Sequence, residues 1–304
     1  MRCAVFGASS FLARYVIERL LAKKNNTVIA FSRNADSAKH LKVLGYPGQI
    51  RIVEYNNKLP HTFIDNFDVV INFIGAINVL SPKKDFFKLH SQIPELIAQE
   101  CMAHKVKNFI HFSAMGINNS PTLYARSKIS GERAVIAAFP SATIIRPSLM
   151  YGTDSMLFNF LYTIAQAYVY PMIKLKTIFQ PIFVDDVAKF VLSALDNNMV
   201  GMYEVAGPRV YSIGELMEVF SKRNPMHMHV CIPISYNIAQ FIFYIMNLPL
   251  MRVFFAKSYL SIDWLKFVQN NALVTKNNAL LSLGIKPVWL ESVLIKYFAN
   301  NNDV

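Results

Sequence analysis

An α/β fold built on a doubly wound parallel sheet is predicted by three features of this sequence. Short apolar runs alternate with amphipathic stretches through the first half of the chain, and a glycine turn directly follows the first run. Hydrophobic residues make up 53% of the chain and charged residues 16%, which excludes disorder, collagen and a coiled coil. Alternating strands and helices form parallel βαβ units, whose right-handed crossovers cover both faces of one sheet.

The order of the elements follows from these runs. Strands are predicted at residues 2–6, 27–32, 50–54, 68–73, 108–113 and 142–146, and helical periodicity is clearest at 11–23, 86–104 and 123–138. Residues 155–173 and 224–251 contain no Lys, Arg, Asp or Glu, so the composition changes after about residue 150. We expect a sheet domain over residues 1–150. A smaller lobe over 151–304 should add the last sheet strands and end in a helix near 289–299.

The charge and the cysteine content indicate which cellular compartment and which kinds of partner to expect. Lys and Arg number 31 against 19 Asp and Glu, a net charge of +12 that favours anionic partners. The mean hydropathy of +0.29 shifts that choice towards a membrane surface. The three cysteines, Cys3, Cys101 and Cys231, form no paired motif, which suits a reducing compartment. A strand begins directly after Met1, so we expect no cleavable leader and a bacterial cytoplasmic protein.

The first strand runs into the turn GASSFLA at residues 7–13. Small residues let the backbone approach a ligand, and the free N–H groups and dipole of the following helix suit a pyrophosphate. The alternative is an ordinary strand–helix turn in which a serine caps the helix. The predicted dinucleotide contacts in this turn are Gly7, Ser9, Ser10, Phe11 and Leu12.

Residues after the next strands extend this site. Arg33 follows the second strand, where an acidic residue would bind the ribose 2′-hydroxyl of NAD(H) and an arginine accommodates the 2′-phosphate of NADP(H). The alternative is a solvated arginine. Asn56 follows the third strand and is expected at the adenine edge. Residues 72–75, which include Ile74 and Gly75, should lie under the nicotinamide ribose. The pattern favours NADP(H), with NAD(H) as the alternative.

Tyr124 and Lys128 are spaced to share one face of the predicted helix. An ammonium group beside a phenol lowers the pKa of the phenol, which would prepare Tyr124 as a general acid and base for a carbonyl/alcohol couple. Ser113, at the end of the fifth strand, would hold the substrate oxygen. The alternative is that this spacing marks a surface helix only.

Taken together, several segments resemble the extended and atypical short-chain dehydrogenase/reductases, which include the NAD-dependent epimerase/dehydratase group. This resemblance implies a Rossmann sheet. More narrowly, the chain resembles the nucleotide-binding accessory subunit of respiratory complex I (NADH:ubiquinone oxidoreductase) and its bacterial relatives. The resemblance covers about residues 2–210 and rests on VFGASSFLARYV, FDVVINFIGA, KNFIHFSAMG, YARSKISGERAV, FPSATIIRPSLMYG and QPIFVDDVAK.

That resemblance implies a tightly held NADP(H), often structural, in the domain over residues 1–150. It implies cofactor contacts from Gly7, Ser10, Phe11, Leu12, Arg33, Gly75, Tyr124, Lys128, Pro147 and Ser148. Two departures favour binding over turnover: Ser10 and Ala13 replace glycines of the family turn, and only 11 positions separate Ser113 from Tyr124. The implied partners are subunits of a membrane respiratory complex.

The apolar segment 231–256 is interrupted by polar residues and flanked by Pro233 and Pro249, so it is too short to span a membrane. No acidic residue occurs between Glu218 and Asp263. We expect a helix that lies on an anionic membrane surface or docks on a partner. The expected location is peripheral, on the cytoplasmic face of the bacterial inner membrane. The alternative is a buried helix of the small lobe.

Two other chemistries find little support in the sequence. His227 and His229 have no Cys or carboxylate nearby, so we expect no metal site. Basic residues are scattered rather than interleaved with aromatics, so we expect no nucleic-acid partner. The sequence predicts an NADP(H)-binding accessory or assembly protein of complex I. The alternative is a stand-alone NAD(P)H-dependent reductase or a sugar-nucleotide epimerase/dehydratase-like enzyme, and enzymatic turnover stays open.

Overall fold

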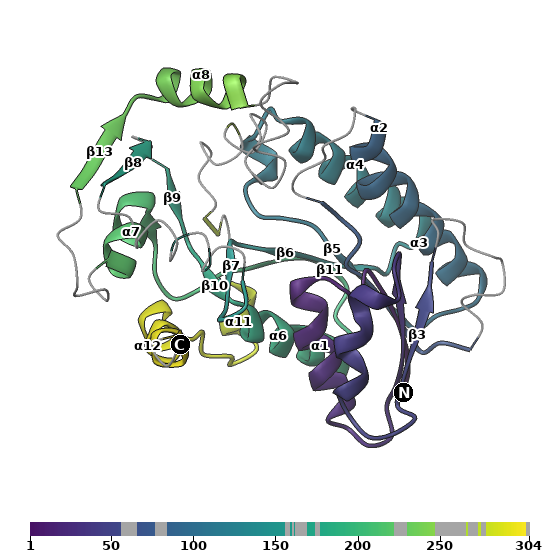
Figure 1. Cartoon of the computed structure of the whole chain (residues 1–304). Coiled ribbons are helices and arrows are strands. Elements are labelled where there is room, and N and C mark those ends of the chain that lie inside the picture. The colour runs from purple at the N-terminus through teal and green to yellow at the C-terminus, as the bar shows by residue number, and fades with distance from the viewer. Residues whose placement is uncertain are drawn as a thin grey trace.

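The described residues form a central sheet of seven parallel strands with helices on both faces (Figure 1). The computed structural model describes residues 1–55, 66–76, 84–155, 159, 161, 169–173, 177–221, 230–246, 266, 273–274 and 278–301. The strands are β1 (Arg2–Phe6), β2 (Thr27–Ser32), β3 (Ile50–Glu54), β4 (Val69–Asn72), β5 (Asn108–Phe112), β6 (Thr143–Pro147) and β11 (Gly201–Val205). Their order, β11-β6-β5-β4-β1-β2-β3, confirms the predicted doubly wound sheet.

Two layers of helix cover this sheet. Helices α1 (Phe11–Leu21) and α6 (Val184–Asp196) pack on one face. The other face carries α3 (Ile93–Ala103) and α4 (Leu123–Ala138), with α2 (Lys84–Phe87) and the π-helical turn η2 (Lys88–Gln92) leading into α3. The single helix predicted at 86–104 is therefore interrupted by a π-helical turn. Short 3-10 segments, η1 (Asp36–Val43) and η3 (Ile117–Asn119), lie in the connections.

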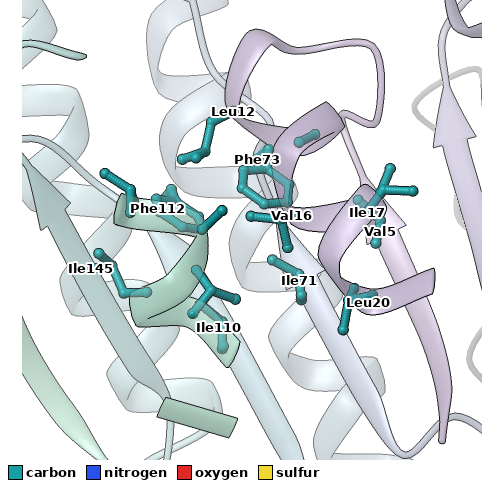
Figure 2. Packing of buried hydrophobic residues seen from close by; sticks show 14 of the residues in the cluster. Val5, Leu12, Val16, Ile17, Leu20, Ile71, Phe73, Ile110, Phe112 and Ile145 are labelled. Carbon is teal, nitrogen blue, oxygen red and sulfur yellow. The ribbon is translucent and has the colours of Figure 1, made fainter. Parts of the chain in front are cut away.

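The core under α1 brings three strand ends together. Leu12 and Val16 of α1 lie over Phe73, which follows β4, and over the strand residue Ile71 (Figure 2). The Phe73 ring stacks on the Phe112 ring of β5, with ring centroids 4.6 Å apart and planes 17° apart. Burial of large apolar side chains of this kind stabilises each by about 1.5–3 kcal/mol. This packing fixes the loops after β1, β4 and β5 beside one another.

An ion pair connects the two helices on that face. Arg19 of α1 donates from Nε and from one terminal nitrogen to the two carboxylate oxygens of Asp185, both at 2.6 Å. Such bidentate geometry is the strongest form of an arginine–carboxylate contact. Asp185 lies in the first turn of α6, where a negative charge also complements the helix dipole. Helix α6, from the second half of the chain, is thereby fixed on the central sheet.

A second bidentate pair fixes α4 on the opposite face. Arg146 of β6 donates to Glu132 of α4 at 2.7 and 2.5 Å, and both side chains are buried. Gly131 of the same helix lies against the main chain of η2, because a Cβ there would stand 1.7 Å from the carbonyl oxygen of His90. The register of α4 is therefore set from the sheet side and from its neighbouring helix.

The remaining elements form a lobe beyond β6 (Figure 1). Its strand pairs are β7 (Met150–Tyr151) with β10 (Ile182–Phe183), β9 (Ile178–Phe179) with β12 (Tyr211–Ser212), and β8 (Val169–Ile173) with β13 (Val230–Ile234). Its helices are α7 (Ile213–Ser221), α8 (Tyr236–Met246) and α12 (Leu290–Asn301), whereas α11 (Ala279–Ser282) packs in the core that α1 and α6 share with the sheet. The bounds of α12 agree to within two residues with the terminal helix predicted near 289–299.

Asp186, fully buried in the first turn of α6, ties this lobe to the sheet. Its carboxylate accepts the N–H of Val288 at 2.7 Å and a hydrogen bond from Lys189 at 2.7 Å. The Tyr151 hydroxyl donates to the Val288 carbonyl at 2.7 Å. In the described part of the chain, no helix is long and apolar enough to cross a membrane.

Candidate functional site

A crevice for a ligand is expected where the strand order reverses, at the carboxyl ends of β1 and β4. Strand β1 pairs with β2 on one side and with β4 on the other, so the chain changes direction there. Gly7 follows β1 with a φ of +73°, and the N–H groups of Gly7 and Ala8 both donate to Phe31 O at 3.1 Å. A Cβ on Gly7 would lie 2.9 Å from the carbonyl carbon of Phe73, so only glycine fits this turn.

The N-terminus of α1 faces this crevice with unpaired donors. Ser10 caps the helix: its Oγ accepts the Ala13 N–H at 3.4 Å. The N–H groups of Phe11 and Leu12 donate to no acceptor among the described residues. Two free N–H groups at the positive end of a helix suit a phosphate. Serine capping and phosphate binding, which the sequence presented as alternatives, are therefore compatible.

The side chains of Phe11 and Leu12 have different surroundings. Leu12 is buried in the core under α1, so only its main chain can meet a ligand. The half-buried Phe11 ring packs edge-on against Tyr15, with centroids 5.6 Å apart, and fills the space beside Gly152. If Leu12 contacts the cofactor as predicted, it does so through its N–H group and not through its side chain.

Hydroxyl groups gather beyond the end of β2. Ser32 Oγ donates to the carbonyl of Asn34 at 2.8 Å and lies 3.4 Å from Ser9 Oγ and 3.2 Å from Ser37 Oγ. Arg33 is exposed beside this cluster and forms no ion pair with any residue that the structure describes. The region where Arg33 is predicted to contact the adenosine ribose therefore has several hydroxyls, among them that of Ser9 from the glycine turn, and one exposed positive charge. Asn56, predicted at the adenine edge, lies outside the described residues.

The loop after β4 meets α4 at the other end of the crevice. The Ile74 N–H donates to Asn72 Oδ1 at 3.0 Å, and Gly75 is exposed. A Cβ on Gly75 would lie 3.2 Å from Lys128 Nζ and 3.5 Å from His90 Nε2. The structure thus brings together Gly75 and Lys128, two of the predicted cofactor contacts, and places His90 beside them.

Tyr124 and Lys128 lie one turn apart on α4 and both are buried. Lys128 Nζ donates to the Phe112 carbonyl at 3.0 Å. Burial lowers the pKa of Lys128 to about 8, and the nearby Glu132 carboxylate opposes this shift. Burial raises the pKa of Tyr124. The expectation that Lys128 lowers the pKa of Tyr124 is therefore wrong for this structure, because desolvation of the phenolate dominates.

The predicted residues after β5 and β6 lie at the same edge of the sheet. Ser113 donates its N–H to Ile145 O at 2.8 Å, while its buried Oγ has no partner among the described residues. Pro147 accepts the Met115 N–H at 3.0 Å, and the Ser148 N–H donates to Val205 O at 2.9 Å. An unpaired buried hydroxyl costs about 1–3 kcal/mol, so Ser113 Oγ is suited to meet a ligand oxygen.

Two buried histidines of this region were missed from the sequence. His90 accepts the Ala76 N–H at 3.0 Å, and His111 contacts Asn72 Nδ2 at 3.1 Å. Burial and the Lys128 charge lower the pKa of His111 to about 3, and the same two effects, with a smaller one from His111, lower that of His90 to about 2. His90 lies in the helix predicted at 86–104, and His111 lies in the predicted strand 108–113. Neither belongs to a sequence pattern that predicts a functional role, so both were overlooked.

Metal chemistry has no visible basis in the described ranges. No group of three or more His, Cys, Asp or Glu side chains there could hold a metal ion. His227 and His229 lie outside those ranges. The groups at the carboxyl ends of β1, β4 and β5 suit a dinucleotide instead, because they include free N–H donors, a glycine turn and a buried lysine.

Strand order, glycine turn and the buried tyrosine–lysine pair together define a dinucleotide fold of the short-chain dehydrogenase/reductase type. The chain belongs to the NAD dependent epimerase/dehydratase family, which matches residues 3–214. This family assignment agrees with the resemblance seen in the sequence.

Several curated relatives at about 30% identity are subunits named for NADH dehydrogenase or NADH-ubiquinone oxidoreductase. The chain is 32% identical over 225 residues to NADH dehydrogenase [ubiquinone] 1 alpha subcomplex subunit 9, mitochondrial, of Arabidopsis thaliana, covering 71% of this chain and 56% of that protein. It is 32% identical over 222 residues to the Mus musculus protein of the same name, covering 70% and 59%. The NADH-ubiquinone oxidoreductase 40 kDa subunit of Neurospora crassa is 30% identical over 236 residues, covering 75% and 62%. The match thus spans less than two thirds of each relative.

Solved structures share the fold at low identity. A dTDP-glucose 4,6-dehydratase from Streptomyces venezuelae, DesIV with NAD and TYD bound, gives a TM-score of 0.76 at 15% identity over 100% of this chain and 98% of that one. The enzyme WbmG of Bordetella bronchiseptica in complex with NAD gives 0.74 at 13% identity, over 99% and 94%. These likenesses confirm the Rossmann-type architecture.

We expect dinucleotide affinity to fall as the pH rises above about 8, the pKa of Lys128 in the free protein. An anionic ligand stabilises the ammonium form and raises that pKa in the complex, so binding at higher pH requires proton uptake. The dissociation constant of NADPH should then rise by roughly tenfold per pH unit and stay level at lower pH. Calorimetry over a pH series measures this. Lys128→Met should give a flat curve, and a flat wild-type curve would contradict the expectation.

Proposed function

We propose that this protein binds and retains a dinucleotide, with NADP(H) preferred over NAD(H), as an accessory or assembly subunit associated with respiratory complex I. The observation that carries the proposal is the start of α1, directly after the glycine turn that follows β1. There the N–H groups of Phe11 and Leu12 donate to no acceptor among the described residues, and Gly7 lets the turn lie close to Phe73. A pyrophosphate would satisfy these donors without moving the backbone. The identity to complex I subunits supports the accessory role.

The NADP(H) preference rests on the end of β2. Arg33 is exposed with no acidic residue at positions 32–35, and the hydroxyls of Ser9, Ser32 and Ser37 lie beside it. A 2′-phosphate would bind the guanidinium group and the hydroxyls, whereas the 2′-hydroxyl of NAD(H) finds no carboxylate in this segment. The solved NAD-bound neighbours show the fold and leave this preference to be measured.

Calorimetry with NADPH and NADH tests the preference. The charge-assisted contact of Arg33 with the 2′-phosphate should contribute roughly 1.5–3 kcal/mol, which is about tenfold to a hundredfold in affinity. Arg33→Ala should remove that difference by weakening NADPH alone. Arg133, an exposed arginine of α4, provides the control, since Arg133→Ala should leave both affinities unchanged. Equal affinities of the wild type for the two dinucleotides would contradict the proposal.

A stand-alone reductase or epimerase/dehydratase-like enzyme is the second candidate. The buried Tyr124–Lys128 pair and the unpaired Oγ of Ser113 favour it, because they supply an acid/base group and a hydroxyl for a substrate oxygen. We place binding first because burial raises the pKa of Tyr124, so the phenol resists giving up its proton at neutral pH.

Substitution of Tyr124 separates the two candidates. If the protein turns over a carbonyl or alcohol substrate, Tyr124→Phe should lower the rate by about 10²–10⁴-fold while NADPH stays bound. Under the accessory role, wild type and Tyr124→Phe should retain NADPH equally and show no substrate-dependent change in its absorbance. A variant with full turnover would remove Tyr124 from the chemistry.

The proposed location is peripheral, on the cytoplasmic face of the bacterial inner membrane, through α8. Phe241 and Tyr244 on this helix are 64% and 60% exposed, and Ile238 is 52% exposed, while Ala239 is buried in a cluster with Met115, Phe179 and Ala206. The alternative of a buried helix disagrees with these exposed side chains. The chain between Glu218 and Asp263 has basic residues and no acidic ones, so an anionic lipid surface is the occupant that its charge fits.

Flotation with vesicles tests this attachment. Wild type should bind vesicles containing phosphatidylglycerol and release at high salt, because each basic residue near the surface adds about 1 kcal/mol that salt screens. Phe241→Glu and Tyr244→Glu should abolish binding. Leu96, an exposed residue of α3, provides the control, and Leu96→Glu should bind as wild type does. Equal flotation of all four proteins, or none by wild type, would exclude α8 as the membrane contact.

A further inference from the structure

The loop that follows β4 is held from inside the protein by two side chains. The Ile74 N–H donates to Asn72 Oδ1 at 3.0 Å, and the Ala76 N–H donates to His90 Nε2 at 3.0 Å. Gly75, between these two residues, is exposed. The main chain of this loop is therefore shaped by acceptors that lie behind it.

Hydrogen bonding fixes the protonation of the His90 ring. Ser127 Oγ donates its proton to the Tyr124 carbonyl at 2.8 Å, so it accepts from His90 Nδ1 at 2.8 Å. The ring is thus neutral with its proton on Nδ1, and Nε2 keeps the lone pair that accepts the Ala76 N–H. Burial and the neighbouring Lys128 charge lower the pKa of His90 to about 2, so this arrangement persists at physiological pH.

The position of His90 is itself determined by backbone contacts. It lies in the π-helical turn η2, and the absence of a Cβ on Gly131 lets the His90 carbonyl approach α4. The imidazole is fully buried and stands edge-on to the Tyr124 ring, with centroids 5.4 Å apart and planes at 90°. Interruptions of this kind in a helix are often found at functional sites.

The His90 ring thereby contacts both the loop after β4 and helix α4. His90 bonds to the loop at Ala76 and, through Ser127, to α4 at the turn that carries Tyr124 and Lys128. Gly75 lies between the ring and Lys128, since a Cβ on it would be 3.5 Å from His90 Nε2 and 3.2 Å from Lys128 Nζ. A change in the ring would therefore move the loop relative to Lys128.

We propose that His90 is a positioning residue for the nicotinamide half of the dinucleotide site, where it fixes residues 74–76 against Tyr124 and Lys128. This inference rests on the proposed dinucleotide function. His90 itself touches no reacting atom and leaves the adenosine half of the site, around Arg33 and Ser9, unaffected. It therefore acts on one half of the ligand only.

Calorimetry with a whole dinucleotide and a half dinucleotide tests the proposal. His90→Leu leaves the Ala76 N–H without an acceptor and should weaken NADPH binding by roughly tenfold. The affinity for 2′,5′-ADP, which lacks the nicotinamide half, should stay unchanged. His90→Gln offers a carbonyl oxygen as acceptor and should recover most of the NADPH affinity. His104, at the end of α3, is the control, and His104→Leu should bind both ligands as wild type does.

Hydrogen exchange in the ligand-free protein gives a second, independent readout. The Ala76 amide should exchange faster in His90→Leu than in wild type, whereas the amides of β4 should keep their rates. Unchanged Ala76 exchange, or equal loss of NADPH and 2′,5′-ADP affinity in His90→Leu, would overturn the positioning role. A wild type that binds neither ligand would refute the proposed function, and the exchange rates would then still decide whether His90 orders the loop.

Discussion

The bidentate ion pair between Arg146 and Glu132 places α4 on the sheet, and the candidate site depends on that placement. Both side chains are almost fully buried, and removal of either would break a buried bidentate pair and leave the other charge with weaker partners only, Glu204 at 3.9 Å for Arg146 and Lys128 for Glu132. Lys128 precedes Glu132 by one helical turn, and the same carboxylate opposes the effect of burial on the Lys128 pKa. A strand residue thus fixes the register of the helix and, through Glu132, helps to keep the site lysine charged.

The Lys128 charge in turn organises the polar groups between α4 and the sheet. After burial it is the next cause that lowers the pKa values of His90 and His111, so both rings stay neutral. Neutral imidazoles have an acceptor nitrogen, which His90 uses for the Ala76 N–H and His111 for the Asn72 amide. Burial and one ammonium group together therefore keep both rings in the form that can accept a hydrogen bond. Preorganised polar groups of this kind retain a ligand at little cost in reorganisation.

The sheet could be predicted from the sequence because six apolar runs end in turns, and each run forms a strand within one residue of its predicted range. The position of strand β11 could not be predicted from the sequence, because its first two residues are exposed and it therefore lacks a continuous apolar run. Its place in the sheet depends on pairing with β6, which is a tertiary contact. The Tyr124–Lys128 spacing predicted proximity correctly but not the pKa of Tyr124, since burial depends on the whole fold. His90 was missed because a π-helical turn leaves no pattern in a single sequence.

Helix α8, the proposed membrane contact, and the loop after β5, at the candidate dinucleotide site, share one small hydrophobic cluster. Ala239, the buried residue of α8, lies in a cluster with Met115, Phe179 and Ala206. Met115 stands two residues after Ser113, and its N–H bonds to Pro147 at the edge of the crevice. Ala239 therefore packs α8 directly on a residue of the loop after β5. Because protein interiors are close-packed, even a small change of side-chain volume in this cluster would be felt by both segments.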